Sequence, residues 1–257
     1  MWLTNVEFRR ALSLGIDRDQ CTEESPYNPG REFLKLWSTH DPKNANAMLD
    51  KIGLGKKDGE GYRLRTDGKG RLRIEVTTYL GFMPFTQIAE MIKTQWAKIG
   101  IQADVAELER SLLNSRRANN ETQISMEIMW GTENLYAHSP VTLFPYDPTS
   151  AVGPLYGKWF ATGGASGKTP PGRLKELLEL YRAGFSAPEK QHYELGKKIW
   201  RIAIEEQYVI GTVGLAPGIM GLRVVKNTMG NVPQRMFNGS STLHPKQSKP
   251  ETAFYKG

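Results

Sequence analysis

Apolar residues near the start of the chain recur every three or four positions, the spacing of one face of an α-helix. They predict a helix over residues 8–16, with Thr4 or Asn5 as its N-cap. A second helix is predicted after Asp41, a residue type that caps helices well, with Pro42 in its first turn.

The clearest helical pattern covers residues 85–99. It lies between residues 72–79 and 102–108, in which apolar and polar residues alternate as in a strand. This order predicts a parallel pair of strands joined by a right-handed crossover. Residues 62–65 also alternate, and with the turn at residues 67–68 they predict a hairpin with residues 72–79. The predicted buried face of the helix consists of Ile88, Met91, Ile92, Trp96 and Ile99.

The same spacing rules predict the later elements. They are a short helix at Leu112 and Leu113, a strand over residues 124–130, helices over residues 172–183 and 188–206, and short strands over residues 209–213 and 219–225. Glu205 and Glu206, at the end of the last helix, are interpreted as a solvated pair. The predicted fold class is therefore α/β, with a mixed sheet flanked by helices.

The regular pattern breaks over residues 131–170. These forty residues hold six glycines, five prolines and many aromatic residues, so they are too long for a passive connector and too aromatic for disorder. In open α/β sheets, ligands bind outside the carboxyl ends of the strands, and this segment follows such an end. The predicted ligand-binding residues are Trp130, Thr132, Glu133, Tyr136, Tyr156 and Trp159. The alternative is that these aromatic side chains pack into a small core of the loop's own.

Composition argues against several other functions. The formal net charge is +7, but the basic residues are scattered and form no run of five, so nucleic-acid binding is not predicted. The single cysteine, Cys21, rules out an internal disulfide and a cysteine-based zinc site. No apolar run approaches the length of a membrane span.

Chemical motifs are weak. Residues 162–169 nearly match a phosphate-binding loop, but Thr162 stands where the first glycine belongs, and two prolines interrupt the helix that should follow. The four histidines are not at metal-ligand spacing, and no serine-hydrolase motif occurs. We therefore expect no enzyme activity, no metal and no cofactor.

Three short segments occur in a characteristic order. They read VEFRRALSLGIDR at residues 6–18, DPKNANAMLDKIG at residues 41–53 and WAKIGI at residues 96–101. In this order they resemble the second lobe of family 5 extracellular solute-binding proteins, the peptide-type substrate-binding proteins of ABC importers. That family's patterns are VRxAxxxAIDR, DPxKAxxLLxxxG and lxKIGI. The segment near residues 20–21 is shorter than in the family, as if trimmed.

The resemblance implies one lobe of a type II periplasmic-binding-protein-like architecture. Residues 1–230 would form the second lobe, and residues 231–257 would return to a first lobe, so that the chain is expected to be a fragment with a signal peptide upstream. The whole protein is expected to be a periplasmic or extracellular, membrane-associated monomer. It would capture a small solute, an oligopeptide or oligosaccharide, in an inter-lobe cleft and deliver it to ABC permease subunits.

The resemblance also implies roles for single residues. Relatives have a tryptophan at the strand end that Trp130 matches, and Trp159 is similar to a second aromatic residue of their loop. Many peptide-binding relatives carry an aspartate that holds the peptide's amino terminus, and Glu133 is the nearest substitute here. Stacking tryptophans with neutral polar partners would suit a sugar equally well. The alternative function is a basic interaction domain that binds nucleic acid or an anionic surface.

Overall fold

The computed structural model describes residues 2–18, 36–81, 83–128, 135–136, 140–212, 226–232 and 254–255. The first part of the chain forms a short 3-10 turn, four helices, a π turn and three strands. These are η1 (Trp2–Thr4), α1 (Val6–Leu14), α2 (Pro42–Leu49), η3 (Asp50–Leu54), β1 (Arg73–Tyr79), α3 (Phe85–Ala97), β2 (Gln102–Leu108), α4 (Arg110–Ala118) and β3 (Ile124–Ser125). The rest forms α5 (Pro154–Ala161), α6 (Gly172–Gly184), α7 (Glu189–Glu206), β4 (Met229–Gly230) and β5 (Phe254–Tyr255).

The predicted helix starts are confirmed at the atomic level. The side chain of Asn5 accepts a hydrogen bond from the backbone N–H of Glu7 at 2.9 Å, so Asn5, not Thr4, is the N-cap of α1. Asp41 caps α2 in the same way, through the N–H of Asn44 at 2.9 Å. Each cap satisfies an N–H that the helix itself leaves unpaired.

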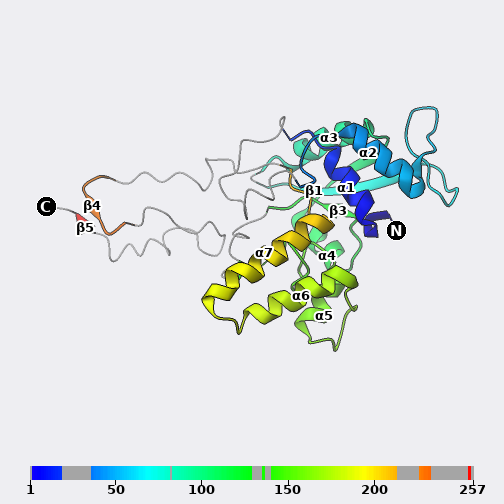
Figure 1. The fold of residues 1–257 in the computed structure, drawn as a ribbon. Coiled ribbons are helices and arrows are strands. Elements are labelled where there is room, and N and C mark those ends of the chain that lie inside the picture. The colour runs from blue at the N-terminus through cyan, green and yellow to red at the C-terminus, as the bar shows by residue number, and fades with distance from the viewer. Residues whose placement is uncertain are drawn as a thin grey trace.

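The sheet has the strand order β2-β1-β3, and both pairings are parallel (Figure 1). The predicted parallel pair is therefore confirmed, in a register that runs from Arg73 opposite Gln102 to Tyr79 opposite Leu108. The α/β class predicted from the sequence holds. The predicted short strands after α7 do not form over residues 209–212, and residues 213–225 lie outside the described part.

Successive side chains of β1 point to opposite faces of the sheet. Ile74 and Val76 join the main apolar cluster with residues of α1, α2, η3 and α3. On the other face, Tyr79 packs with Leu113 of α4. The central strand is thus covered on both faces, as expected for a parallel sheet. Trp96 of α3 is 3% exposed and donates from its indole Nε1 to the carbonyl of Leu12 at 2.9 Å, which confirms its predicted place in the core.

Two details of this half differ from the prediction. Residues 62–65 form only isolated antiparallel bridges: Arg63 pairs with Lys57, and Leu64 pairs with Arg71 across the predicted turn. Met91, expected on the buried face of α3, is 38% exposed, since Ala89 and Gln95 lie toward the core instead.

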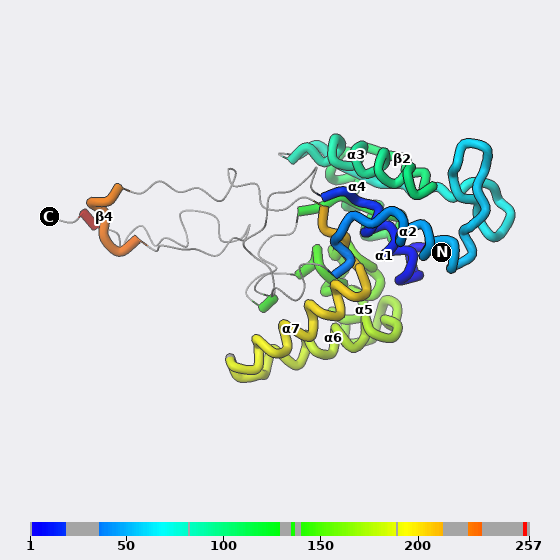
Figure 2. The backbone as a smooth tube through the Cα atoms, turned by 45° about the horizontal axis from the view of Figure 1, so that its top comes forward, coloured from blue at the N-terminus to red at the C-terminus, as the bar shows by residue number. Residues whose placement is uncertain are grey.

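A second apolar cluster forms around the α6–α7 hairpin, with both helices within one or two residues of their predicted bounds. Figure 2 shows α5, α6 and α7 grouped together, below α1–α3. The cluster includes Leu135, Phe144 and Tyr181. The segment predicted as one long loop contains the helix α5, which the sequence pattern did not reveal because its glycines and prolines masked it.

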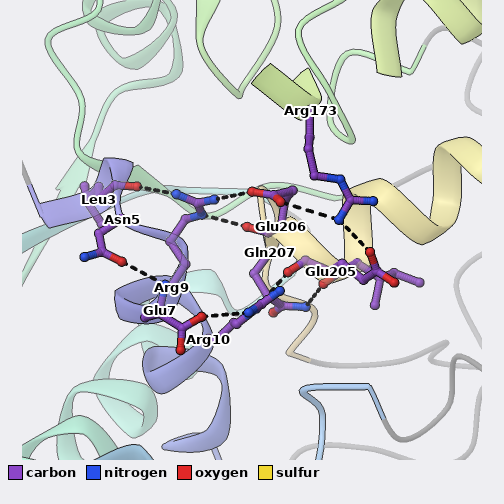
Figure 3. A network of polar contacts seen from close by, with 10 residues as sticks. Leu3, Asn5, Glu7, Arg9, Arg10, Arg173, Glu205, Glu206 and Gln207 are labelled. Atoms are coloured by element: carbon purple, nitrogen blue, oxygen red, sulfur yellow. Dashed lines mark hydrogen bonds and ion pairs between the residues drawn. The ribbon is translucent and has the colours of Figure 1, made fainter. Parts of the chain in front are cut away.

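The two clusters meet at a polar junction between α1 and the end of α7 (Figure 3). Arg9 Nε donates to the carbonyl of Glu206 at 2.8 Å, and Arg10 Nε donates to the carbonyl of Glu205 at 2.9 Å. Arg173 of α6 forms ion pairs with the same two glutamates, at 2.6 Å to Glu205 and 3.7 Å to Glu206. Arg201 lies 3.7 Å from Glu205 as well. The interpretation of Glu205 and Glu206 as a solvated pair is therefore wrong: they are partners of four arginines.

At the far end of the described chain, β4 pairs with β5 in an antiparallel ladder. Most of residues 231–257 lies outside the described part, so the predicted boundary at residue 230 stays a prediction. Within the described residues, no helix combines the length and apolar character needed to cross a bilayer.

Candidate functional site

The carboxyl ends of β1, β2 and β3 lie at one edge of the sheet, because all three strands run in the same direction. We call this the carboxyl edge. Strand β1 ends there at Tyr79 and β2 at Leu108. The chain leaves β3 through Glu127 and Ile128 and then enters residues 129–134, which lie outside the described part. The predicted ligand loop therefore starts from the edge at which ligands bind open α/β sheets.

A buried polar network stands at this edge. The phenol of Tyr79 donates to Glu127 Oε1 at 2.9 Å, and Arg117 Nη2 donates to Glu127 Oε2 at 3.1 Å. The guanidinium of Arg110, at the start of α4, lies 4.3 Å from the centre of the Tyr79 ring. Each Glu127 oxygen has a partner, so the carboxylate is fixed in orientation.

The network has clear electrostatic consequences. Burial of the Tyr79 phenol, together with the adjacent Glu127 carboxylate, raises the pKa of Tyr79 to about 12. Tyr79 therefore stays a neutral donor at all physiological pH values. Arg117 is 8% exposed, and its Nε lacks a hydrogen-bond partner among the described atoms. Arg110 is half-exposed, 4.0 Å from Glu127, and can present its remaining N–H groups outward.

Apolar side chains flank the network. Leu80, directly after β1, is 83% exposed, and Leu112 on α4 is half-exposed. The ring of Phe85 lies 4.7 Å from that of Tyr79 and supports it from beneath. An edge with exposed apolar groups and a few fixed polar groups can bind an organic solute. Among the described residues, no three His, Cys, Asp or Glu side chains gather as a metal site.

The predicted site residues fall into three groups. Trp130, Thr132 and Glu133 lie outside the described residues. Tyr156 and Trp159 lie on α5, three residues apart and partly exposed. They share a helix that contacts α4, the helix that follows β2 at the carboxyl edge.

Tyr136 lies elsewhere, in the α6–α7 cluster. Its ring stacks on Tyr181 at 5.2 Å and on His192 at 4.8 Å, and it meets the edge of Phe185 at 5.7 Å. Burial raises the pKa of Tyr136, and its hydroxyl is buried without a hydrogen-bond partner in the described part. In the structure, Tyr136 thus packs into an apolar cluster. This is the alternative role that was considered for the aromatic side chains of the loop. Its assignment to the ligand site stays a prediction.

Sequence reasoning missed the four residues of the carboxyl-edge network, which are Tyr79, Arg110, Arg117 and Glu127. Two signals were present. Tyr79 stands at the end of a predicted strand and Glu127 lies within another, and a pair of arginines closes the helix that follows β2. What the sequence could not show is that α4 folds across the sheet and brings Arg117 to Glu127.

One cavity among the described residues lies at the other edge of the sheet. It has a volume of about 450 Å³, and its charged lining includes Arg65, Asp67 and Arg73. These arginines already form ion pairs with Asp67 and Asp104. The charges in this cavity are therefore satisfied within the chain, and we place the candidate site at the carboxyl edge.

Comparison with known proteins agrees with this geometry. Residues 1–150 match the family described as bacterial extracellular solute-binding proteins, family 5 Middle. A solved structure of the oligopeptide-binding protein OppA is 27% identical, with a TM-score of 0.75, and the match covers 99% of this chain and 44% of that one. A search of curated proteins found no match.

Two further solved structures share the fold. MelB from Agrobacterium fabrum C58, in complex with stachyose, is 19% identical with a TM-score of 0.64; the match covers 81% of this chain and 33% of that one. AppA from Bacillus subtilis, in complex with a nonapeptide, is 18% identical with a TM-score of 0.57; the match covers 80% and 41%. The chain thus spans less than half the length of each.

The fold is that of one lobe of the type II periplasmic-binding-protein class. Because the family match covers more than half of the chain, the protein belongs to family 5 of the bacterial extracellular solute-binding proteins. The resemblance read from the three sequence segments is confirmed.

Proposed function

We propose that the protein of which this chain forms part captures a peptide-like solute in a cleft between two lobes and delivers it to an ABC permease. The observation that carries this proposal is the family match over residues 1–150, joined with the match to OppA across 99% of the chain. In this proposal the carboxyl edge and the loop that leaves it form one wall of the cleft. Closure of a second lobe over that wall would bury the solute.

The polar groups at the wall suit a peptide. Arg110 is half-exposed and offers N–H donors to peptide carbonyls or to a carboxylate. Glu133 is the carboxylate that would meet a cationic amino terminus, and Trp130 would stack on the ligand from the strand end. OppA and the nonapeptide complex of AppA are both oligopeptide-binding proteins by name.

An oligosaccharide is the second candidate. The structural relative MelB was solved with stachyose. Tyr156 and Trp159 of α5 are partly exposed, and aromatic faces with polar handles stack on sugar rings as readily as on peptides. In this case Thr132 would contribute hydroxyl hydrogen bonds, and Glu133 would meet no positive charge.

Calorimetry on the two-lobed protein separates the two solutes. We would titrate oligopeptides with free amino termini and neutral oligosaccharides into the wild type and into Glu133→Gln. A peptide binder should lose affinity strongly in Glu133→Gln, by a factor that shrinks at high salt because screening weakens the lost charge pair. A sugar binder should change little. The matched control is Glu121→Gln, an exposed carboxylate on the loop before β3.

The proposal also covers the setting of the protein. It would act as a monomer outside the cytoplasmic membrane, with the permease as its macromolecular partner. A basic interaction domain that binds nucleic acid is the competing function, given the net charge of +7. Such a domain would bind nucleic acid with an affinity that falls steeply as salt is raised, because contacts with phosphates release counterions. Binding of a solute in a neutral aromatic cleft releases no counterions. Tight binding of duplex DNA with that dependence, and no solute binding, would overturn the importer function.

A further inference from the structure

The turn between α6 and α7 exposes two large aromatic side chains. Phe185, directly after α6, is 61% exposed, and Tyr193, in the first turns of α7, is 64% exposed. Figures 1 and 2 show this end of the hairpin projecting away from the sheet. Exposed apolar side chains gathered in one region of the surface are a feature of interaction sites.

The turn is rigidly built. The ring of Phe185 packs edge-on against Tyr181 at 5.0 Å, and the imidazole Nε2 of His192 is 2.7 Å from the carbonyl oxygen of Gly184. A side chain on the Gly184 position would collide with the Tyr136 hydroxyl, so the backbone here is in close contact with the aromatic cluster. The exposed rings are therefore held in place by the cluster beneath them.

Positive charge surrounds these rings. Residues 182–201 contain five Lys or Arg residues and two Glu residues. Lys190 and Lys198 are exposed and form no ion pair with any described side chain. The ammonium of Lys197 lies 4.8 Å from the centre of the Tyr193 ring. Aromatic rings beside lysines are the combination found where proteins meet a bilayer interface.

We propose that this surface, the hairpin tip formed by Phe185, Lys190, Tyr193, Lys197 and Lys198, contacts an anionic lipid bilayer. A projecting, convex tip fits a broad flat surface, and its charge is complementary to anionic headgroups. The rings insert at the headgroup level while the lysines remain in water beside the phosphates. This contact lies on a part of the molecule separate from the carboxyl edge and does not depend on the identity of the solute.

Vesicle co-sedimentation of the full chain tests the proposal. The vesicles contain either phosphatidylcholine alone or phosphatidylcholine with phosphatidylglycerol. We expect binding only to the anionic vesicles, with an affinity that falls as salt is raised. The double variant Lys190→Gln with Lys198→Gln should bind roughly 25-fold more weakly, because each basic residue near an anionic surface contributes about a fivefold factor.

Two controls make the result specific. Lys43→Gln with Lys51→Gln removes the same charge from exposed positions on α2 and η3, at the other end of the molecule, and should leave vesicle binding within about twofold. Tyr193→Ser should weaken binding, whereas Leu112→Ser, at another exposed apolar position, should not. Circular dichroism confirms that each variant is folded.

Three outcomes would overturn the proposal. They are equal binding to both kinds of vesicle, absence of binding to the anionic ones, and equal losses in the tip variant and the α2–η3 control. If the vesicles do not bind but the tip lysines govern binding to a poly-glutamate peptide, the tip is a site for an acidic protein and not for a membrane.

Discussion

Arg63 shows how one side chain can join three segments. It is fully buried and donates to the carbonyl of Ile99 at 2.8 Å, to Asp50 Oδ1 at 2.6 Å and to Asn46 Oδ1 at 2.7 Å. Its guanidinium thereby links α2, η3 and the segment that follows α3. A buried arginine is tolerated only because its N–H groups are paired in this way.

Replacing Arg63 should be costly. Arg63→Met leaves buried carbonyls without donors, and each unpaired buried group costs about 1–3 kcal/mol, so the total should exceed about 3 kcal/mol. Arg65→Met is the matched control: it removes an exposed ion pair with Asp67 and should leave stability nearly unchanged, because exposed ion pairs contribute little. Urea unfolding of both variants measures the difference, and equal losses would show that Arg63 is not the link described.

Tyr79 should make stability depend on alkaline pH. Burial and the neighbouring Glu127 raise its pKa from 10.0 to about 12, so the folded state favours the neutral phenol. This contribution is fully present below pH 10 and is lost as pH rises toward about 12. In Tyr79→Phe the loss of stability over this range should be smaller than in the wild type. Thermal unfolding across the range, with Tyr62→Phe as control, tests this; identical alkaline slopes would contradict it.

At the scale of the element, α5 depends on a glycine. A Cβ at Gly157 would stand 2.1 Å from the carbonyl oxygen of Asp147, so only glycine allows α5 to approach the preceding turn. That turn is itself fixed by Ser150, whose Oγ accepts hydrogen bonds from the backbone N–H groups of Tyr146 and Asp147. Close packing of backbone against backbone explains why a glycine stands within this helix.

Two glycine substitutions should therefore have opposite signs. Gly157→Ala should destabilise the protein by about 1–3 kcal/mol, since the methyl group forces α5 away from residues 147–150. Gly196→Ala lies in α7 with open space around it and should stabilise the protein by about 0.5–1 kcal/mol. Midpoints of urea unfolding report both. A stabilising Gly157→Ala would mean that the contact with Asp147 is not close.

At the scale of the molecule, polar contacts connect the two apolar clusters. The arginines of α1 donate to the last carbonyls of α7, where the helix carries partial negative charge. These contacts give a structural reason for the arginines near the start of the family-like segment at residues 6–18. Arg18, which closes that segment, similarly donates to the carbonyls of Ser13, Ser38 and Gly211. The arginines of the segment at residues 6–18 thus hold distant parts of the chain together.

Loss of this junction should loosen one cluster more than the other. In Arg9→Gln with Arg10→Gln, we expect faster hydrogen exchange in α6 and α7, while α1–α3 and the sheet keep most of their protection. Exchange measured by mass spectrometry resolves these segments. The control is Arg73→Gln, which breaks an exposed pair with Asp104 and should leave α6 and α7 unchanged. A uniform increase across both clusters would show that they unfold as one unit.

The sequence by itself determined the elements whose cause is local. Caps at Asn5 and Asp41, the stripe that buries Trp96, the strand over residues 102–108 and the bounds of α6 and α7 all depend on residues within a few positions of one another. Three ordered segments were also enough to indicate the family, because they carry its anchoring residues. The class of fold and the family could therefore be predicted before any coordinates.

Only the tertiary structure decided which side chains meet. The sequence placed Met91 in the core and Glu205 and Glu206 in water, but neighbouring elements set their exposure. The network of Tyr79, Arg117 and Glu127 joins residues up to 48 positions apart, and no local pattern records that proximity. Periodicity shows which face of an element is apolar; only the packing of one element against another shows what that face, and the polar groups beside it, will touch.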